Sequence, residues 1–186
     1  MTELEHELKC ILDSDEYDLI LKVLDTIPYI EETQINYYYD TLSEKLRYEN
    51  ITLRIRQKNG RFRGTIKKYL KNSHCSEETS FKIDHIPSVM VFESVPVYLK
   101  GSLKTKRITK YLSESVKIMV DKNEYLGTQD FELEIECPED FLTQAGGILF
   151  LLKKIINSKR EEGTMSKSER FFLYLHKNAQ EQMNIK

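Results

Sequence analysis

Two stretches near opposite ends of the chain alternate strictly between charged and apolar residues. Residues 3–9 read Glu-Leu-Glu-His-Glu-Leu-Lys, and residues 130–137 repeat the pattern as Asp-Phe-Glu-Leu-Glu-Ile-Glu-Cys. Because alternate residues of a β-strand share a face, each stretch predicts a strand with a row of carboxylates on one side. Either strand alone is typical of an amphipathic strand whose acids face water. The strands between them favour a different interpretation.

Those intervening strands carry basic residues at alternating positions. The segment 52–61 contains Asn-Gly near its end, which is typical of a two-residue hairpin, and a second strand follows over 62–70. Another strand is expected at 101–109, where Lys104 and Lys106 lie on the outer face. The basic residues expected on the other faces of these strands are Arg54, Arg56, Lys67 and Arg107. Guanidinium groups bind phosphate oxygens bidentately, so this pattern indicates a polyanion site.

Three segments have the apolar period of helices. The first follows Asp13 and Glu16, which are spaced as a capping box, and it ends at Pro28. The second covers 138–156, with acids at its start and lysines near its end, as the helix dipole favours. The third begins with another capping box in the segment 166–169. All three present apolar stripes that predict packing against a sheet.

The remaining segments are predicted from their turn-forming residues and prolines. Residues 34–41 are aromatic and extended in character, and we expect the tyrosines of this strand to pack in the ordinary way. A polar loop is expected at 71–78, before a short strand at 79–83. The segment 86–99 contains two prolines and is expected to include a short helix, and 121–124 (Asp-Lys-Asn-Glu) predicts a turn.

Composition limits the classes of protein to be considered. A length of 186 residues and a 40% hydrophobic share fit one soluble domain with its own core. With 28 basic against 30 acidic residues, no net field favours a nucleic-acid or membrane partner, and the apolar run 146–152 is too short to span a bilayer. Three widely spaced cysteines without a CxxC motif predict reduced thiols in the cytoplasm rather than a disulfide frame or zinc site.

The acidic and basic strand faces together predict an enclosed site. At least seven strands joined mostly by short connections favour an antiparallel sheet that curls or closes, with the helices on its outer face. The charged faces would then line the interior, where isolated ions are costly unless they are paired. Clustered carboxylates are ligands for Mg²⁺ or Mn²⁺, and clustered Arg and Lys bind phosphate, so the combination indicates a metal ion with a polyphosphate.

Taken together, these motifs resemble the CYTH family, the triphosphate tunnel metalloenzymes. The segment 5–9 (Glu-His-Glu-Leu-Lys) resembles the ExExK signature of that family. Further blocks follow in the family's order: Tyr39-Asp40-Thr41, Leu53-Arg54-Ile55-Arg56, Thr65-Ile66-Lys67, Gly101-Ser102-Leu103 with Arg107, Asp121, and Glu132-Leu133-Glu134. ExExK alone is short and unspecific. Seven blocks in order, over nearly the whole chain, are a strong signal.

The resemblance implies an α+β fold of mainly antiparallel β structure. We expect an eight-stranded β-barrel forming a tunnel, with strands over about 3–137 and C-terminal helices over about 139–182, in a single domain of residues 1–186. It also implies hydrolysis of a small-molecule triphosphate with Mg²⁺ or Mn²⁺. Inorganic tripolyphosphate is the expected substrate, and thiamine or nucleoside triphosphates are alternatives.

Site residues are carried over from the resemblance position by position. Metal ions would be held by Glu5, Glu7, Glu132 and Glu134, with Asp121 as a further acid. The two acidic rows extend by one step at Glu3 and Glu136, so the ligand pair on either strand could be shifted by two residues. The triphosphate would be bound by Arg54, Arg56, Lys67, Arg107 and Lys9. Glu5, Glu7 and Lys9 would form the catalytic group, in which Lys9 orients the attacking water.

Two alternative functions stay open at this point. The same charged groups would serve an adenylate cyclase that makes cyclic AMP from ATP. A non-catalytic barrel that binds polyphosphate or a nucleotide is the other alternative, although such a binder gains little from carboxylates. We expect Arg170 on the surface of the last helix rather than at the tunnel mouth. Whether the protein is a monomer or a homodimer is not indicated by the sequence.

Overall fold

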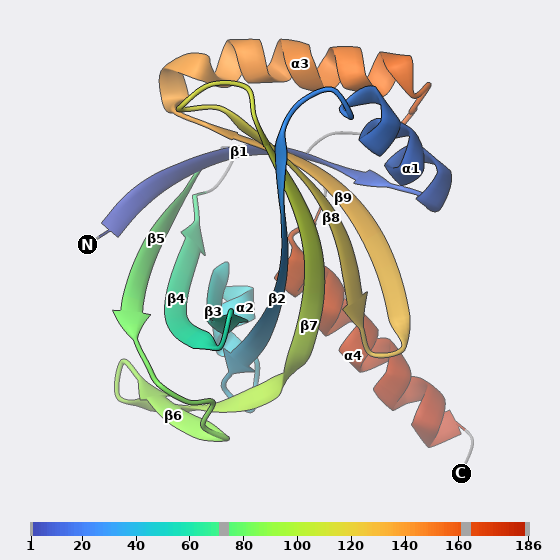
Figure 1. Cartoon of the computed structure of the whole chain (residues 1–186). Coiled ribbons are helices and arrows are strands. Elements are labelled where there is room, and N and C mark those ends of the chain that lie inside the picture. Colours follow the sequence, from blue (N-terminus) through green and yellow to red (C-terminus); the bar gives the residue numbers. More distant parts are fainter. Residues whose placement is uncertain (1, 71–74, 161–164, 185–186) are drawn as a thin grey trace.

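The sheet of this protein closes on itself because β2, at one edge of the strand order, pairs with β7. The computed structural model describes residues 2–70, 75–160 and 165–184, of which residues 2, 3 and 182–184 are described by their backbone only. Within these residues nine strands pair antiparallel in the order β2-β3-β4-β5-β1-β9-β8-β7-β6 (Figure 1). Pairing of β2 with β7 closes eight strands into a barrel, and β6 lies at the edge of β7. The expected eight-stranded antiparallel barrel is confirmed.

The elements have the following bounds. The strands are β1 Thr2–Leu12, β2 Tyr29–Asp40, β3 Ile51–Lys58, β4 Arg61–Tyr69, β5 Cys75–Lys82, β6 Val89–Phe92, β7 Val95–Tyr111, β8 Lys117–Tyr125 and β9 Thr128–Cys137. The helices are α1 Ser14–Val23, α2 Lys45–Tyr48, α3 Leu142–Ile155 and α4 Lys167–Asn184, with a 3₁₀ turn η1 at Glu139–Phe141. None of the described helices is both long and apolar enough to cross a lipid bilayer.

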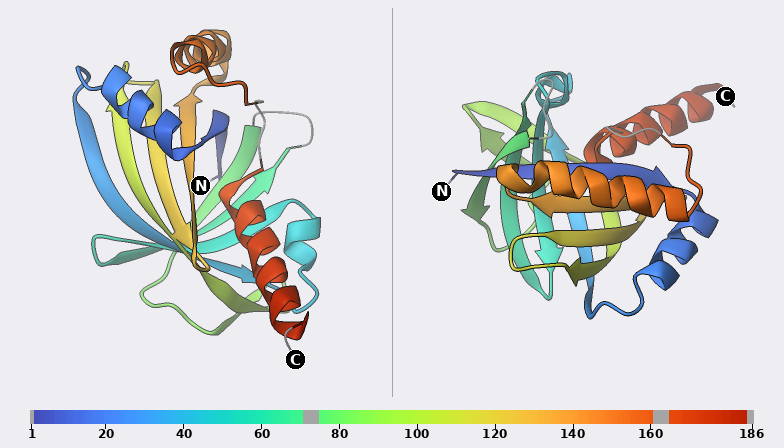
Figure 2. Two further views of the ribbon diagram at one scale, coloured as in Figure 1. Left: turned by 90° about the vertical axis from the view of Figure 1, so that its right-hand side faces the viewer. Right: turned by 90° about the horizontal axis from the view of Figure 1, so that it is seen from above.

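Apolar layers on the outside of the barrel account for the inward direction of its charged residues. Leu8 and Ile135 on the outer faces of β1 and β9 pack with Leu149 of α3, and α1 completes this layer (Figure 2). A second layer covers the outside of β2 and β3, where Tyr39 and Ile55 are buried. Burial of each such side chain contributes about 1.5–3 kcal/mol. Because side chains alternate along a strand, the charged residues between these positions face the interior.

Two tight hairpins rest on turn residues with positive φ. Asn59 and Gly60 (φ 49° and 72°) connect β3 to β4, as the sequence predicts. Leu126 and Gly127 (φ 49° and 77°) connect β8 to β9. The turn predicted at 121–124 is wrong. That segment stays in β8, which is paired with both β7 and β9.

Two further sequence predictions need correction. The short helix predicted within 86–99 is wrong, because β6 and the start of β7 form a hairpin there, with a turn at Glu93 and Ser94 (φ 46° and 65°). The valines of this segment are β-branched and favour strands. The polar loop predicted at 71–78 is too long, because β5 already begins at Cys75, and residues 71–74 lie outside the described residues.

Capping residues determine where the helices begin. Asp13 and Glu16 form the predicted capping box of α1, in which Asp13 Oδ1 accepts from the Glu16 amide at 2.9 Å. The single-turn helix α2 was not predicted, because its anchor is tertiary. The buried carboxylate of Asp40 accepts from the amides of Leu46 and Arg47 at 2.9 and 3.0 Å.

Helix α4 packs against inward-facing residues at one end of the barrel. Phe171 and Phe172 are buried against Tyr38, Leu103 and Tyr125, which lie on β2, β7 and β8. The approach is close at Gly101 of β7 (φ 147°), where an added Cβ would come within 2.8 Å of the Phe171 ring. The start of α4 is therefore fixed beside the charged interior.

Candidate active site

A cavity of about 520 Å³ inside the barrel is lined mainly by charged and polar side chains. The predicted site residues that line it are Glu5, Glu7, Lys9, Arg54, Arg56, Lys67, Arg107, Glu134 and Glu136. Two other predicted acids, Asp121 and Glu132, are fully buried in ion pairs next to this cavity. The side chain of Glu3 lies outside the described residues.

Strand β1 contributes an acidic wall whose charges are already paired. Lys67 Nζ, from β4, donates to Glu5 Oε2 at 2.6 Å and to Glu7 Oε1 at 3.1 Å. Lys9 Nζ donates to the same Glu7 oxygen at 2.8 Å. Burial opposes ionisation of Glu7, but Lys67 and Lys9 outweigh it and lower its pKa to about 2. Burial also opposes the charge on Lys9, whose pKa is nevertheless raised by Glu7, so Lys9 is a hydrogen-bond donor rather than a base at neutral pH.

Strand β9 forms a second acidic wall next to β1. Glu134 Oε2 accepts from Arg107 Nη2 at 2.6 Å, and Glu134 Oε1 accepts from Lys167 Nζ at 2.7 Å. Burial would raise the pKa of Glu134, but Lys167 and Arg107 lower it well below its usual value. Glu134 is therefore a carboxylate throughout the physiological range.

Asp121 of β8 holds Arg107 in one orientation. Arg107 Nε and Nη2 donate to the two carboxylate oxygens of Asp121 at 2.8 and 2.6 Å. This bidentate pair fixes the plane of the guanidinium group. Because Asp121 has no exposed surface, it contributes to the site through Arg107.

The arginines of β3 are less neutralised than the other cations of the cavity. Arg56 Nε donates to Asn36 Oδ1 at 2.9 Å, and in the part of the chain that the structure describes Arg56 has no carboxylate partner. Burial, with Arg54 and Arg107 nearby, lowers the pKa of Arg56 to about 9. Arg54 has one long contact of 3.4 Å to Glu78, and its buried Nε lacks a hydrogen-bond partner among the described residues. These donors are suited to anionic oxygens.

Helix α4 adds a lysine that sequence reasoning missed. Lys167 Nζ lies 3.0, 2.9 and 2.7 Å from carboxylate oxygens of Asp121, Glu132 and Glu134. Lys167 also lines the charged cavity. The capping box at residues 166–169 predicted where α4 begins, but it carried no information about which wall the first turn would meet.

Arg170, three residues further along α4, is not on the surface as predicted. Its Nε and Nη2 donate to Asp130 Oδ2 at 2.8 Å and Glu132 Oε2 at 2.7 Å, and its side chain is only 11% exposed. Residues i and i+3 of a helix share a face, so Lys167 and Arg170 point together into the end of the barrel. The i, i+3 spacing of Lys167 and Arg170, with the apolar residue Phe171 beside them, was the feature of the sequence that could have predicted this position.

The glutamates of β1 and β9 at this site lie on adjacent strands and are paired with lysines. The strand register places Glu136 opposite Glu7. Burial is the main cause that raises the pKa of Glu136, and the nearby charge of Glu5 adds to it. Among the residues described, no three acidic, histidine or cysteine side chains converge as a metal site. Among the same described residues, one buried oxygen, Glu132 Oε1, has no hydrogen-bond partner.

Comparison with known protein families gives a match over most of the chain. Residues 3–167 match the CYTH domain, which covers most of the chain. The chain belongs to the CYTH domain family. The resemblance inferred from the sequence motifs is therefore confirmed.

Relatives of this CYTH protein include enzymes that act on triphosphates. It is 28% identical over 151 residues to YjbK of Bacillus subtilis, provisionally named a triphosphatase, covering 74% of this chain and 79% of YjbK. A protein of Bacillus halodurans provisionally named an adenylate cyclase has a TM-score of 0.73 at 22% identity, covering 92% and 98% of the two chains. HpAC1 from Hippeastrum, an adenylyl cyclase candidate described as having a dominant triphosphatase activity, has a TM-score of 0.72 at 22% identity over 92% and 95%. The latter two comparisons show the fold.

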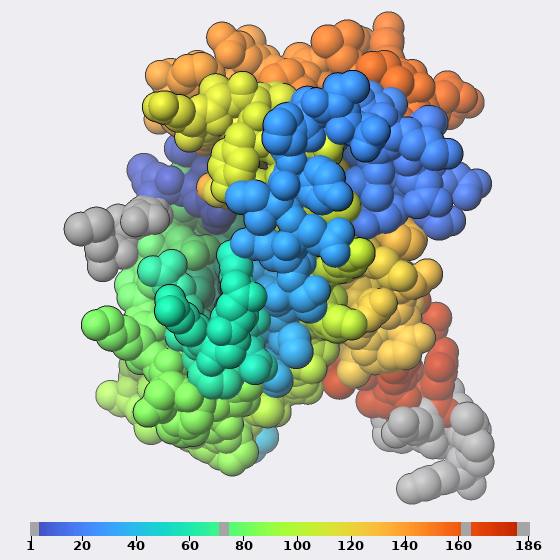
Figure 3. All heavy atoms as spheres, viewed as in Figure 1, coloured from blue at the N-terminus to red at the C-terminus, as the bar shows by residue number. Residues whose placement is uncertain are grey.

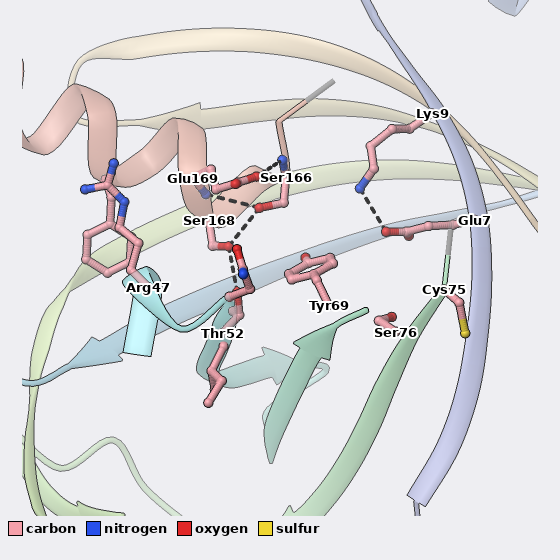
Figure 4. A pocket seen from close by; sticks show the side chains of 13 residues that line it. Glu7, Lys9, Arg47, Thr52, Tyr69, Cys75, Ser76, Ser166, Ser168 and Glu169 are labelled. Atoms are coloured by element: carbon pink, nitrogen blue, oxygen red, sulfur yellow. Dashed lines mark hydrogen bonds and ion pairs between the residues drawn. The ribbon is translucent and has the colours of Figure 1, made fainter. Parts of the chain in front are cut away.

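Two further cavities of this CYTH barrel share residues with the charged one. A cavity of about 210 Å³ lies beside Glu7 and Lys9 and is also lined by Tyr69, Ser168 and Phe172 (Figure 4). A cavity of about 690 Å³ shares residues with the charged interior, among them Arg56, Arg107 and Lys117, and most of its other lining residues come from β2, β3, β4 and β7. The interior thus continues into one partly apolar and one strongly basic space.

Proposed function

We propose that this protein hydrolyses a triphosphate group held inside the barrel, with a divalent metal ion as cofactor. The observation that carries the proposal is the pair of partly buried guanidinium groups at Arg54 and Arg56. Within the described residues, Arg56 has no carboxylate partner and Arg54 has only the 3.4 Å contact to Glu78, and both line the same cavity as the carboxylates Glu7 and Glu134. A site that only bound phosphate would gain little from those acids. The triphosphatase names of YjbK and HpAC1 support the same reaction.

The cations of the interior would bind and orient the anion. Arg54, Arg56 and Lys67 would contact phosphate oxygens, and Arg107 would do so in the orientation that Asp121 imposes. Lys9 would donate to the attacking water or to a phosphate oxygen. The water oxygen attacks the terminal phosphorus in line while the bond to the bridging oxygen breaks, which releases orthophosphate and diphosphate. Fixed positive charges stabilise the charge that develops on the transferred group.

Mg²⁺ or Mn²⁺ remains our proposal for the metal ion. The donor set fits a hard cation, because Glu5, Glu7, Glu134 and Glu136 offer carboxylate oxygens from adjacent strands. In addition, one buried oxygen of Glu132 has no hydrogen-bond partner among the described residues. When bound, the ion would neutralise phosphate charge and polarise the reacting bond. The ammonium groups that now pair with Glu5 and Glu7 would be free to turn to the phosphates.

Orthophosphate release tests the proposal directly. The purified protein is incubated with tripolyphosphate, thiamine triphosphate or ATP, in the presence of Mg²⁺, Mn²⁺ or a chelator. We expect release that requires a metal ion, with tripolyphosphate as the smallest sufficient substrate. Tight binding of all three compounds without turnover under either metal would instead favour a non-catalytic barrel.

Cyclisation of ATP is a second candidate, favoured by the cavity beside Glu7 and Lys9. That cavity offers the rings of Tyr69 and Phe172 next to the charged interior, where a nucleoside could lie (Figure 4). The products distinguish the two reactions. Pyrophosphate with cyclic AMP indicates cyclisation, and orthophosphate indicates hydrolysis.

A further inference from the structure

A row of cations continues along the inner face of the barrel beyond the proposed triphosphate site. The register of β3 and β4 pairs Arg56 with Arg63 and Lys58 with Arg61, next to the hairpin turn. By strand parity these residues face the same side as Arg54 and Lys67. The next strand continues the row, because Lys82 of β5 pairs with Arg63. Figure 3 shows the β3–β4 hairpin exposed beside β2 on this side of the molecule.

These outer cations are poorly neutralised. Within the described parts of the chain, Arg61, Arg63 and Lys82 have no ion-pair partner, and all three are exposed. Lys58 is paired with Glu32 at 2.6 Å. Glu32 is the one acidic residue among those described that line the 690 Å³ cavity at this mouth. The mouth therefore has a net positive charge.

The row is longer than a triphosphate needs. From Lys67 to Arg61 the chain advances six residues, or about 20 Å at the rise of a β-strand. The terminal three phosphates of a ligand bound next to Glu7 and Glu134 would occupy the inner part of this length. The outer part, from Arg56 to Arg61, stays in contact with the interior because the two cavities share Arg56 and Arg107.

We infer that this protein binds linear polyphosphate chains longer than three phosphates, with the end of the chain in the proposed site and the rest along the outer cations. This inference rests on the proposed function for the position of the chain end. Polyphosphate carries charge on every unit and no other groups, which matches a surface made of guanidinium and ammonium groups.

A nucleic acid with a 5′-triphosphate is the competing ligand. Proteins that bind single strands combine a basic groove with aromatic rings on which bases stack. The aromatic residues near this row, Phe62 and Phe81, pack instead with the apolar layer outside the barrel. Tyr111 is half-exposed at this mouth but lies on β7, which β2 separates from β3 in the barrel. These positions favour polyphosphate.

Binding as a function of chain length tests the inference. Dissociation constants are measured for tripolyphosphate and for linear polyphosphate of about 15 and about 50 units, at equal concentrations of chain ends. We expect the longer chains to bind about tenfold more tightly, with a steeper dependence on salt because more counterions are released. Equal affinity for all lengths would overturn the inference and leave the proposed hydrolysis unaffected.

A pair of matched double variants assigns the gain to the outer cations. Arg61→Gln with Arg63→Gln should remove most of the gain with chain length while the affinity for tripolyphosphate stays within about twofold. The control, Lys104→Gln with Lys106→Gln, removes the same charge from the outer face of β7, where the lysines pair with Glu124 and Glu31. An equal loss in both double variants would show non-specific attraction and overturn the inference.

Two further outcomes separate the possible failures. If long chains bind through Arg61 and Arg63 but no triphosphate is hydrolysed, the binding inference holds and the proposed function fails. If a triphosphorylated RNA oligomer displaces the 50-unit chain more effectively than tripolyphosphate does, and the Arg61→Gln, Arg63→Gln variant abolishes that advantage, RNA rather than polyphosphate is the ligand.

Discussion

At the level of single residues, the interior is a set of buried charges that depend on each other. Glu134 is the central acid, because it accepts hydrogen bonds from both Arg107 and Lys167. Breaking a buried pair by removing one partner costs about 3–5 kcal/mol, since the other charge stays buried. Replacing Glu134 therefore tests site chemistry and stability at once.

We expect Glu134→Gln, and likewise Glu7→Gln, to lower triphosphate turnover by at least about 100-fold, because a proposed metal ligand and a partner of buried cations are both lost. Steady-state orthophosphate release measures this effect. The control is Glu124→Gln, an exposed acid at the end of β8 that pairs with Lys104. Wild-type turnover in both site variants would contradict the assignment of these acids.

We expect Arg56 to lower the stability of the ligand-free protein and to strengthen tripolyphosphate binding. Its pKa is lowered to about 9 by burial and by the nearby arginines. Below that pH Arg56 is charged in the folded protein, and this buried charge lowers the free energy of unfolding. We expect Arg56→Gln to raise the melting temperature without ligand by about 3 °C, or ~1 kcal/mol, and to weaken tripolyphosphate binding. Thermal unfolding with and without tripolyphosphate measures both. A lower melting temperature without ligand would show that Arg56 is already neutralised.

At the level of elements, α4 joins the apolar and charged parts of the protein. Its aromatic residues Phe171 and Phe172 close one end of the barrel, and Lys167 and Arg170 in the same turns meet the acids of β8 and β9. The position of these cations therefore depends on how the helix packs.

Phe171→Ala should cost about 3–5 kcal/mol of unfolding free energy, because this fully buried ring contacts Tyr38 and lies against Gly101. Turnover should fall as well, since Lys167 loses its support. Leu173→Ala on the same helix is the control, because Leu173 is 43% exposed and should change stability by less than about 0.5 kcal/mol. Urea unfolding of both variants compares the costs. Equal costs would contradict the role given to Phe171.

At the level of the whole molecule, the enclosed charges make folding sensitive to acid. The pKa of Glu7 is about 2 in the folded protein, against an ordinary value of 4.5, and that of Glu134 is also lowered. At pH values between the folded and the unfolded pKa of each group, the unfolded chain binds more protons than the folded one. The free energy of unfolding therefore falls as the pH decreases.

We expect the urea midpoint to be nearly constant above about pH 5 and to fall steadily as the pH drops from about 4.5 toward 2. Glu7→Gln should reduce this loss, because the variant has one fewer carboxylate to protonate. Unfolding curves recorded at intervals between pH 6 and 2 measure the slope. A midpoint that rises on acidification would contradict the ion pairs described for Glu7.

The sequence by itself determined which residues share a face, because side-chain parity and capping are local properties of the chain. The alternation in 3–9 and 130–137, the Asn59-Gly60 turn and the capping box at Asp13 needed no knowledge of the fold. The resemblance of the motifs to a known family also predicted that the sheet closes into a barrel. The outward or inward direction of each charged row then followed from the apolar residues between its members.

Only the tertiary structure decided how these faces meet. Strand register placed Glu136 opposite Glu7, and it put Arg61 and Arg63 in line with Arg56. Packing of α4 on the barrel end buried Glu132 under Lys167 and Arg170, although Arg170 was expected on the surface of the helix. Helix α2 formed around the carboxylate of Asp40. Each of these features joins elements that are distant in sequence, and their relative positions come from the packing of many side chains rather than from any local pattern.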